Sequence, residues 1–176
     1  MNLLMLSDTL VRAINDQINF EMYSANIYFA MQAYCDSIDL DGFANFFKVQ
    51  IEEENYHVTR FYDFLKRTNS RIIIGTVESP DNNYDSVNDA FKKALDHEKK
   101  VTKRIYNLMN LATEEKEHAT ISLLKWFIDE QIEEEDTFSK LIKKLDRIGD
   151  NSAALYMLDT ELQSRTFVPP VNTTVN

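Results

Sequence analysis

Four long segments of the chain carry apolar residues at alternating intervals of three and four positions. This spacing gathers the apolar side chains on one face of an α-helix. The segments run from Ser7 or Asp8 to about Asp36, from about Asp41 to Lys66, from Asp85 or Ser86 to about Leu111, and from the turn at 113–118 to about Ile148. A shorter repeat covers about 153–163. The pattern predicts an all-α fold, a four-helix bundle followed by a short fifth helix.

The connections between these segments differ greatly in length. Ser37–Gly42 is short, so the first two helices should form an antiparallel hairpin. Arg67–Asp85 contains helix-breaking residues, and about 17 extended residues can reach about 55 Å. The second helix is only about 40 Å long. This long crossover can therefore return the chain to the other end of the bundle and leave the third helix parallel to the second.

Two further stretches stand out from the helical pattern. Ile72–Ile74 is an apolar run within the crossover that needs cover, either from its own bundle or from another subunit. We interpret it as a candidate interface strip. Residues 166–176 include Pro169 and Pro170 among several Thr and Asn residues, and we expect a disordered tail there. The expected domain is therefore 1–165.

Composition narrows the function classes. Three Gly and three Pro in 176 residues agree with long helices and few turns. A net charge of −10 argues against a nucleic-acid partner. The single Cys35 excludes a disulfide framework and a thiolate zinc cluster. The first residues resemble neither a signal peptide nor a membrane span, so we expect a cytoplasmic protein without a membrane partner.

Polar residues interrupt each apolar face near the middle of its helix. They are Glu21 on the first helix, Glu54 and His57 on the second, Glu98 on the third, and Gln131 and Glu134 on the fourth. In a bundle these breaks meet at one level whichever way each helix runs. Four gathered carboxylates would repel unless cations neutralise them. Oxygen ligands with one imidazole suit iron or manganese, so the sequence predicts a buried site for two metal ions.

Further acidic residues flank this level. Glu53 precedes Glu54, while Glu130 and Glu133 precede Gln131 and Glu134. They could bind a third, weaker metal ion or simply form a solvated acidic face. Tyr28 lies two turns after Glu21 on the same face. It could donate an electron or a hydrogen bond to the site, or it could be a packed core tyrosine.

With these motifs in place, the sequence resembles bacterial non-haem ferritins over about residues 7–165. The matching motifs are Glu21 within Asn19–Ser24, Glu53-Glu54-x-x-His57, Thr76–Pro80, Glu98, and Glu130-Gln131-x-Glu133-Glu134. Ferritin-like di-iron proteins commonly carry Glu-x-x-His on two helices. Here Gln131-x-x-Glu134 replaces the second of these pairs.

The resemblance implies a ferroxidase that oxidises Fe(II) with O2 or H2O2 and stores Fe(III) as a mineral. One iron would be bound by Glu21, Glu54 and His57, and the second by Glu54, Glu98 and Glu134 with Gln131 close by. A third site would comprise Glu53, Glu130, Glu133 and Glu134, with Tyr28 as a redox-active tyrosine. The family forms shells of 24 subunits, in which the crossover would pair across a two-fold axis and the fifth helix would line a four-fold axis.

Related and unrelated alternatives fit less well. In bacterioferritins a Met after the Glu of the second helix ligates haem, whereas this chain has Asn55 there, so no haem is expected, and its fourth helix lacks the His of a Glu-x-x-His pair. One Cys excludes a Cys-rich rubrerythrin module, and mini-ferritins place their metals between subunits. A di-iron oxygenase would need an apolar pocket instead of the acidic flank. The remaining alternative is a helical bundle that binds no metal and serves as a structural or interaction module.

Overall fold

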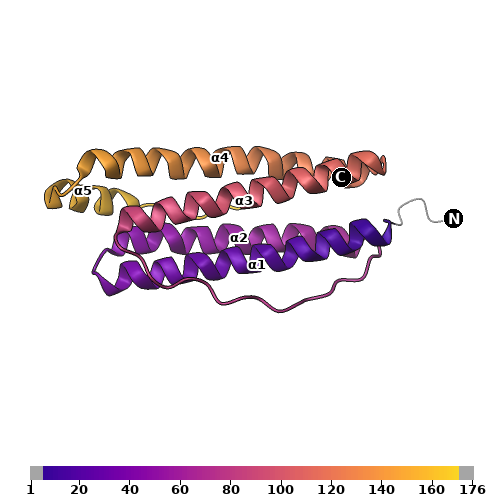
Figure 1. The fold of residues 1–176 in the computed structure, drawn as a ribbon, viewed down its shortest axis with the longest axis horizontal. Coiled ribbons are helices and arrows are strands. Elements are labelled where there is room, and N and C mark those ends of the chain that lie inside the picture. The colour runs from indigo at the N-terminus through magenta and orange to yellow at the C-terminus, as the bar shows by residue number, and fades with distance from the viewer. Residues whose placement is uncertain (1–5, 171–176) are drawn as a thin grey trace.

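The computed structural model describes residues 6–170, which form five helices joined by loops (Figure 1). The helices are α1 (Asp8–Ser37), α2 (Asp41–Arg67), α3 (Val87–Glu114), α4 (His118–Ile148) and α5 (Ser152–Leu162). The predicted four-helix bundle with a long crossover and a short fifth helix is confirmed. Residues 1–5 at the N-terminus and 171–176 of the predicted tail lie outside the described residues.

Side chains mark several helix ends, as the sequence suggests. Ser7 caps α1 by accepting a hydrogen bond from the Leu10 amide at 3.1 Å, and Ser86 caps α3 in the same way. Gly149, the residue just after α4, has a φ of 53° that suits glycine. Among residues 6–170, no helix is long and apolar enough to cross a membrane.

The crossover runs along α1 from one end of the bundle to the other, so that α3 lies parallel to α2 (Figure 1). Asn15 fastens it to α1, donating to the Arg71 carbonyl at 2.9 Å and accepting from the Ile73 amide at 2.7 Å. Asn19 accepts from the Gly75 amide at 2.8 Å. These contacts hold the crossover in an extended conformation.

The apolar triplet of the crossover is only partly covered. Ile72 packs against the core of its own bundle. Ile73 and Ile74 remain 52% and 55% exposed. An apolar strip is thus left open on this face, and its role as an interface stays a prediction.

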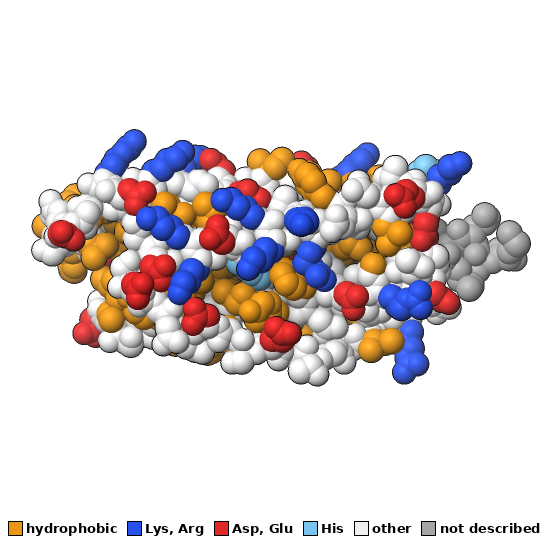
Figure 2. Space-filling view, in the orientation of Figure 1, with side chains coloured by type: hydrophobic (Ala, Val, Ile, Leu, Met, Phe, Trp, Pro, Cys, Tyr) orange, Lys and Arg blue, Asp and Glu red, His pale blue; other side chains and the backbone are white. Residues whose placement is uncertain are grey.

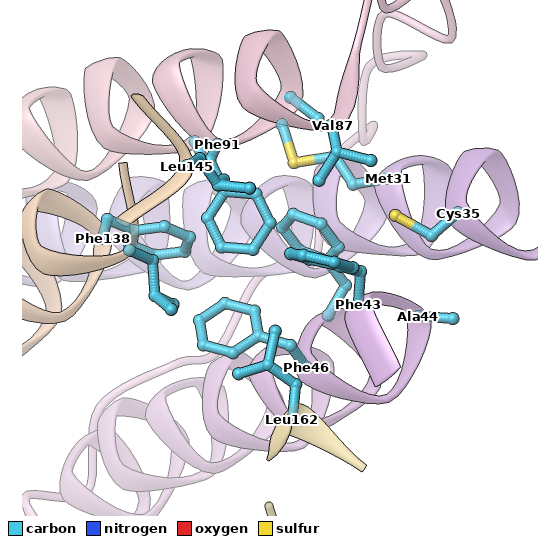
Figure 3. Close-up of a cluster of buried hydrophobic side chains, with 14 of the residues drawn as sticks. Met31, Cys35, Phe43, Ala44, Phe46, Val87, Phe91, Phe138, Leu145 and Leu162 are labelled. Carbon is cyan, nitrogen blue, oxygen red and sulfur yellow. The ribbon is translucent and has the colours of Figure 1, made fainter. Parts of the chain in front are cut away.

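Two apolar clusters fill the bundle on either side of a polar layer. The cluster near α5 includes Phe43, Phe46, Phe91 and Phe138 (Figure 3). The cluster at the other end includes Phe61 and Phe127, whose stacked rings lie 4.0 Å apart. The polar layer therefore lies between two apolar clusters, where unpaired charges are costly.

Helix α5 caps the start of α2. Leu40, the residue before α2, makes no side-chain cap. Instead, one oxygen of Asp159 accepts hydrogen bonds from the amides of Gly42 at 2.8 Å and Phe43 at 3.0 Å. An anion at a helix N-terminus is favourable, so this contact docks α5. A Cβ on Gly42 would lie 1.7 Å from the Asp159 carbonyl oxygen, so this close approach requires glycine.

Gly42→Ala should therefore displace α5 and cost about 2 kcal/mol of stability, as overpacking does. The measurements are thermal unfolding and the hydrogen exchange of α5 amides. Gly75→Ala is the matched control, because its Cβ would meet only the flexible Asn19 side chain, at 3.2 Å. Equal destabilisation by the two substitutions would contradict the role of Gly42.

Candidate metal centre

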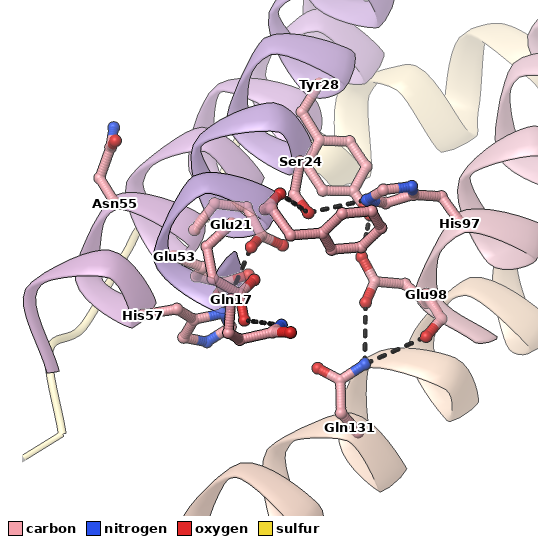
Figure 4. A network of polar contacts seen from close by, with 12 residues as sticks. Gln17, Glu21, Ser24, Tyr28, Glu53, Asn55, His57, His97, Glu98 and Gln131 are labelled. Carbon is pink, nitrogen blue, oxygen red and sulfur yellow. Dashed lines mark hydrogen bonds and ion pairs between the residues drawn. The ribbon is translucent and has the colours of Figure 1, made fainter. Parts of the chain in front are cut away.

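The six polar residues that interrupt the apolar faces are all buried in one layer of the bundle. Their exposed fractions lie between 0% and 5% for Glu21, Glu54, His57, Glu98, Gln131 and Glu134. Each side chain comes from the core face of its own helix, which is why the helical period identifies it. Figure 4 shows part of this layer, with side chains of α1, α2, α3 and α4 converging.

Ligand atoms in this layer fall into groups tight enough for metal ions. The first group is Glu21, Glu54 and His57, and the second is Glu54, Glu98 and Glu134. Within each group the potential ligand atoms lie within 4.8 Å of one another. Glu54 belongs to both groups.

A third group combines His57, Glu130 and Glu134. It contains one of the three flanking residues that the sequence analysis considers, Glu130, and does not include Glu53 or Glu133. Glu53 instead forms an ion pair with Arg165, a residue just after α5, at 3.0 Å. The structure thus groups Glu130 with the inner residues His57 and Glu134.

Several oxygens of this layer have no hydrogen-bond partner among residues 6–170. They are Glu21 Oε2, both carboxylate oxygens of Glu54 and of Glu134, and Gln131 Oε1. Buried polar atoms without a partner are costly and rare. Cations would satisfy all of these oxygens together, so the donor set fits hard metal ions.

Burial also shifts the proton affinities of the candidate ligands. It raises the pKa of Glu21 to about 7, although the Gln17 amide opposes the shift. Burial, followed by repulsion from neighbouring carboxylates, raises the pKa of Glu54 and of Glu134 well above the usual value. Burial lowers the pKa of His57 to about 3. The imidazole is therefore neutral, as a metal ligand must be, and its 3.3 Å contact with Glu54 is not an ion pair.

Two residues that the sequence analysis does not identify orient Glu21. Gln17 Nε2 donates to Glu21 Oε1 at 2.8 Å, and Arg104 Nε donates to Gln17 Oε1 at 2.9 Å. Gln17 lies one turn before Glu21 on the same helix face, a spacing that could have suggested it. No pattern identifies Arg104, because it reaches across from α3.

Tyr28 and Gln131 both hydrogen-bond to Glu98. The Tyr28 hydroxyl donates to Glu98 Oε1, and Gln131 Nε2 donates to Glu98 Oε2 at 3.0 Å (Figure 4). Burial raises the pKa of Tyr28 well above its usual value, so the phenol keeps its proton. The structure therefore places Tyr28 beside the second ligand group.

Two neighbours of the candidate ligands stand apart from the ligand groups. His97 precedes Glu98 but lies 2.7 Å from Ser24 through its Nε2 atom, and burial lowers its pKa to about 4. Asn55 is exposed and points away from the cluster (Figure 4).

Comparisons with known proteins place the chain among ferritins. Residues 11–148 match the family described as Ferritin-like domain. Bacterial non-heme ferritins of Staphylococcus aureus and Staphylococcus epidermidis are 45% identical over 163 residues, which covers 93% of this chain and 98% of each relative. A humanized archaeal ferritin aligns with a TM-score of 0.92 and 41% identity over 93% of this chain and 99% of that one. An open-pore ferritin from Archaeoglobus fulgidus aligns with a TM-score of 0.90 and 42% identity over 92% of this chain and 98% of that one.

Proposed function

Because this chain belongs to the ferritin family, we propose that it stores iron and oxidises Fe(II) at the buried carboxylate layer. The observation that carries the proposal is the position of Glu54, a buried carboxylate that two ligand groups share and whose oxygens have no hydrogen-bond partner among residues 6–170. The relatives' printed names support iron storage. The acidic groups support the more specific ferroxidase role.

The proposed ligand roles follow the two inner groups. Glu21, Glu54 and His57 bind one Fe(II), while Glu54, Glu98 and Glu134 bind the other. Gln131 keeps its carbonyl oxygen free beside the second ion. Hard carboxylates stabilise Fe(III) relative to Fe(II) and so favour oxidation, whereas a neutral amide is a weak ligand that lets the product leave.

The electron balance is simple. Each Fe(II) loses one electron, and the two electrons with two protons convert O2 to H2O2, or H2O2 to two waters. With a third Fe(II), three electrons from iron and one from Tyr28, together with four protons, would convert O2 to two waters; the Tyr28 hydroxyl proton would pass to Glu98 as the ring is oxidised. The apolar clusters on both sides of the polar layer keep bulk water from the ions.

A third, weaker iron position completes the proposed centre. Glu130 and Glu134 supply it in the third ligand group, and Glu53 and Glu133 are its outer acids. Burial and the neighbouring charges of Glu133 and Glu53 raise the pKa of Glu130 to about 7. This repulsion among carboxylates favours a cation at the same place.

Storage further requires a shell, and we propose a homo-oligomer of 24 copies in the cytoplasm. The similarity to ferritins supports the assembly. The exposed Ile73 and Ile74 on the crossover, and Tyr156 and Met157 on α5, provide apolar surfaces for contacts between copies. An oxygenase acting on an organic substrate is the alternative, and the acidic flank disfavours the apolar pocket it would need.

Size-exclusion chromatography with iron quantification after aerobic addition of Fe(II) tests storage. Chains of 20.6 kDa would give a particle of about 490 kDa for 24 copies, and it should retain hundreds of irons. A small oligomer that retains only about two irons per chain would contradict storage and favour the oxygenase.

A further inference from the structure

The chain segment after α5 returns along α2 and places a positive charge on the acidic flank. Arg165 Nη2 donates to both oxygens of Glu53, at 3.1 and 3.0 Å. Arg165 Nη1 donates to the Phe46 carbonyl at 3.1 Å. The guanidinium carbon also lies 4.1 Å from the centre of the Phe46 ring, a cation–π distance.

We call this segment, residues 163–167, the C-terminal strap. Its backbone is attached to α2 by Asn45, whose side-chain amide donates to the Arg165 carbonyl at 2.9 Å. Further along, the Phe167 ring lies 6.0 Å from the Tyr56 ring. The strap therefore contacts α2 on both sides of the Glu53–Arg165 pair, and the position of Arg165 is well determined.

The charge of Arg165 opposes a concentration of acid. Burial, with Glu133 and Glu98, raises the pKa of Glu53, and Arg165 counteracts this shift. The two side chains of the pair are still 24% and 21% exposed. In an ion pair that is partly exposed to solvent, another cation can replace the charged partner more readily than in a fully buried pair.

By contrast, the two inner ligand groups have no such counter-ion within hydrogen-bond distance among residues 6–170. Arg104 acts on Glu21 only through Gln17, and the carboxylate oxygens of Glu54 and Glu134 have no partner. Both oxygens of Glu53 already accept hydrogen bonds from Arg165, so a metal ion on Glu53 would compete with the guanidinium for the same carboxylate charge. Repulsion between that ion and the guanidinium would favour release of Arg165.

We propose that Arg165 acts as a built-in substitute for the third cation, holding Glu53 until an incoming Fe(II) displaces it. This inference rests on the proposed function and deepens it, because it identifies the residue that regulates the third position. It makes the third Fe(II) the weakest bound. When that iron leaves, Arg165 pairs with Glu53 again.

Anaerobic calorimetric titration with Fe(II) tests the proposal on the assembled protein. Arg165→Gln keeps a similar length without the charge, and the weakest binding event should become roughly fivefold to tenfold tighter. The two tighter events should not change. Arg165→Lys should restore weak binding of the third ion. Arg147→Gln, an exposed arginine at the end of α4, controls for the loss of one positive charge.

The same titrations contain the contrary outcomes. A weakest event that is unchanged in Arg165→Gln would overturn the proposal, as would the absence of a third event from every variant. Weakening of all three events would show that Arg165 only supports the fold, and would overturn it too. In Arg165→Gln, adding Glu53→Gln should remove the gain. Failure of the proposed function appears separately, as loss of the two tight events from the unmodified protein.

Discussion

Replacing Glu54 with alanine is expected to slow Fe(II) oxidation by roughly a hundredfold or more. Glu54 contributes to both inner ligand groups, so its loss leaves each ion with two of its three ligands. The rate is measured by stopped-flow absorbance of Fe(III) on mixing with aerobic buffer. His57→Ala removes the only imidazole of these groups and should also slow oxidation.

The shell should survive these changes, because the apolar clusters on both sides of the layer are untouched. Chromatography of each variant checks this. Glu114→Ala is the matched control, since Glu114 is an exposed glutamate in the last turn of α3. Oxidation at an unchanged rate in Glu54→Ala would move the reaction to another part of the molecule.

The metal-free protein is expected to lose stability as the pH rises from 6.5 to 8. The folded-state pKa of Glu21 is about 7 against 4.5 when unfolded, so its contribution is complete below pH 4.5 and is lost as the pH rises through 7. It accounts for roughly 1 kcal/mol in this window. Glu54 and Glu134, with pKa values raised well above 4.5, contribute in the same direction.

The two buried histidines do not obscure this effect. Their lowered pKa values of about 3 for His57 and about 4 for His97 cost stability only below pH 6.5, where the unfolded chain binds protons. In the presence of a chelator the midpoint of thermal unfolding should fall by at least about 3 °C over this window, the part due to Glu21. Glu54→Gln should flatten the dependence, and Glu114→Gln should not. A midpoint that rises with pH would show that the carboxylates are ionised without metal.

The candidate ligands could be predicted because their signal is local. Glu54 and His57 lie three residues apart within an apolar face, and Glu21 and Glu98 interrupt otherwise apolar faces at mid-helix. Helical geometry alone directs such residues into the core. The division into two ion-binding groups came from the family resemblance. Metal binding by these residues stays a prediction.

The missed features depend on contacts between distant parts of the chain. Arg165 reaches Glu53 across 112 positions, and Asp159 reaches Gly42 across 117. No periodicity reports such contacts. Glu53 of the proposed third site is an example. Although it belongs to the acidic motif, it is rotated by about 100° around the helix axis from Glu54. Its side chain therefore meets the returning strap.

The pairing of the helices also sets an order for folding. Short turns join α1 to α2 and α3 to α4, whereas only the crossover joins the two hairpins. Contacts close in sequence form first, so each hairpin can form before they dock. The Glu21, Glu54 and His57 group lies within the first hairpin, but the Glu54, Glu98 and Glu134 group exists only after docking. A cation in the second group therefore slows separation of the hairpins without speeding their formation.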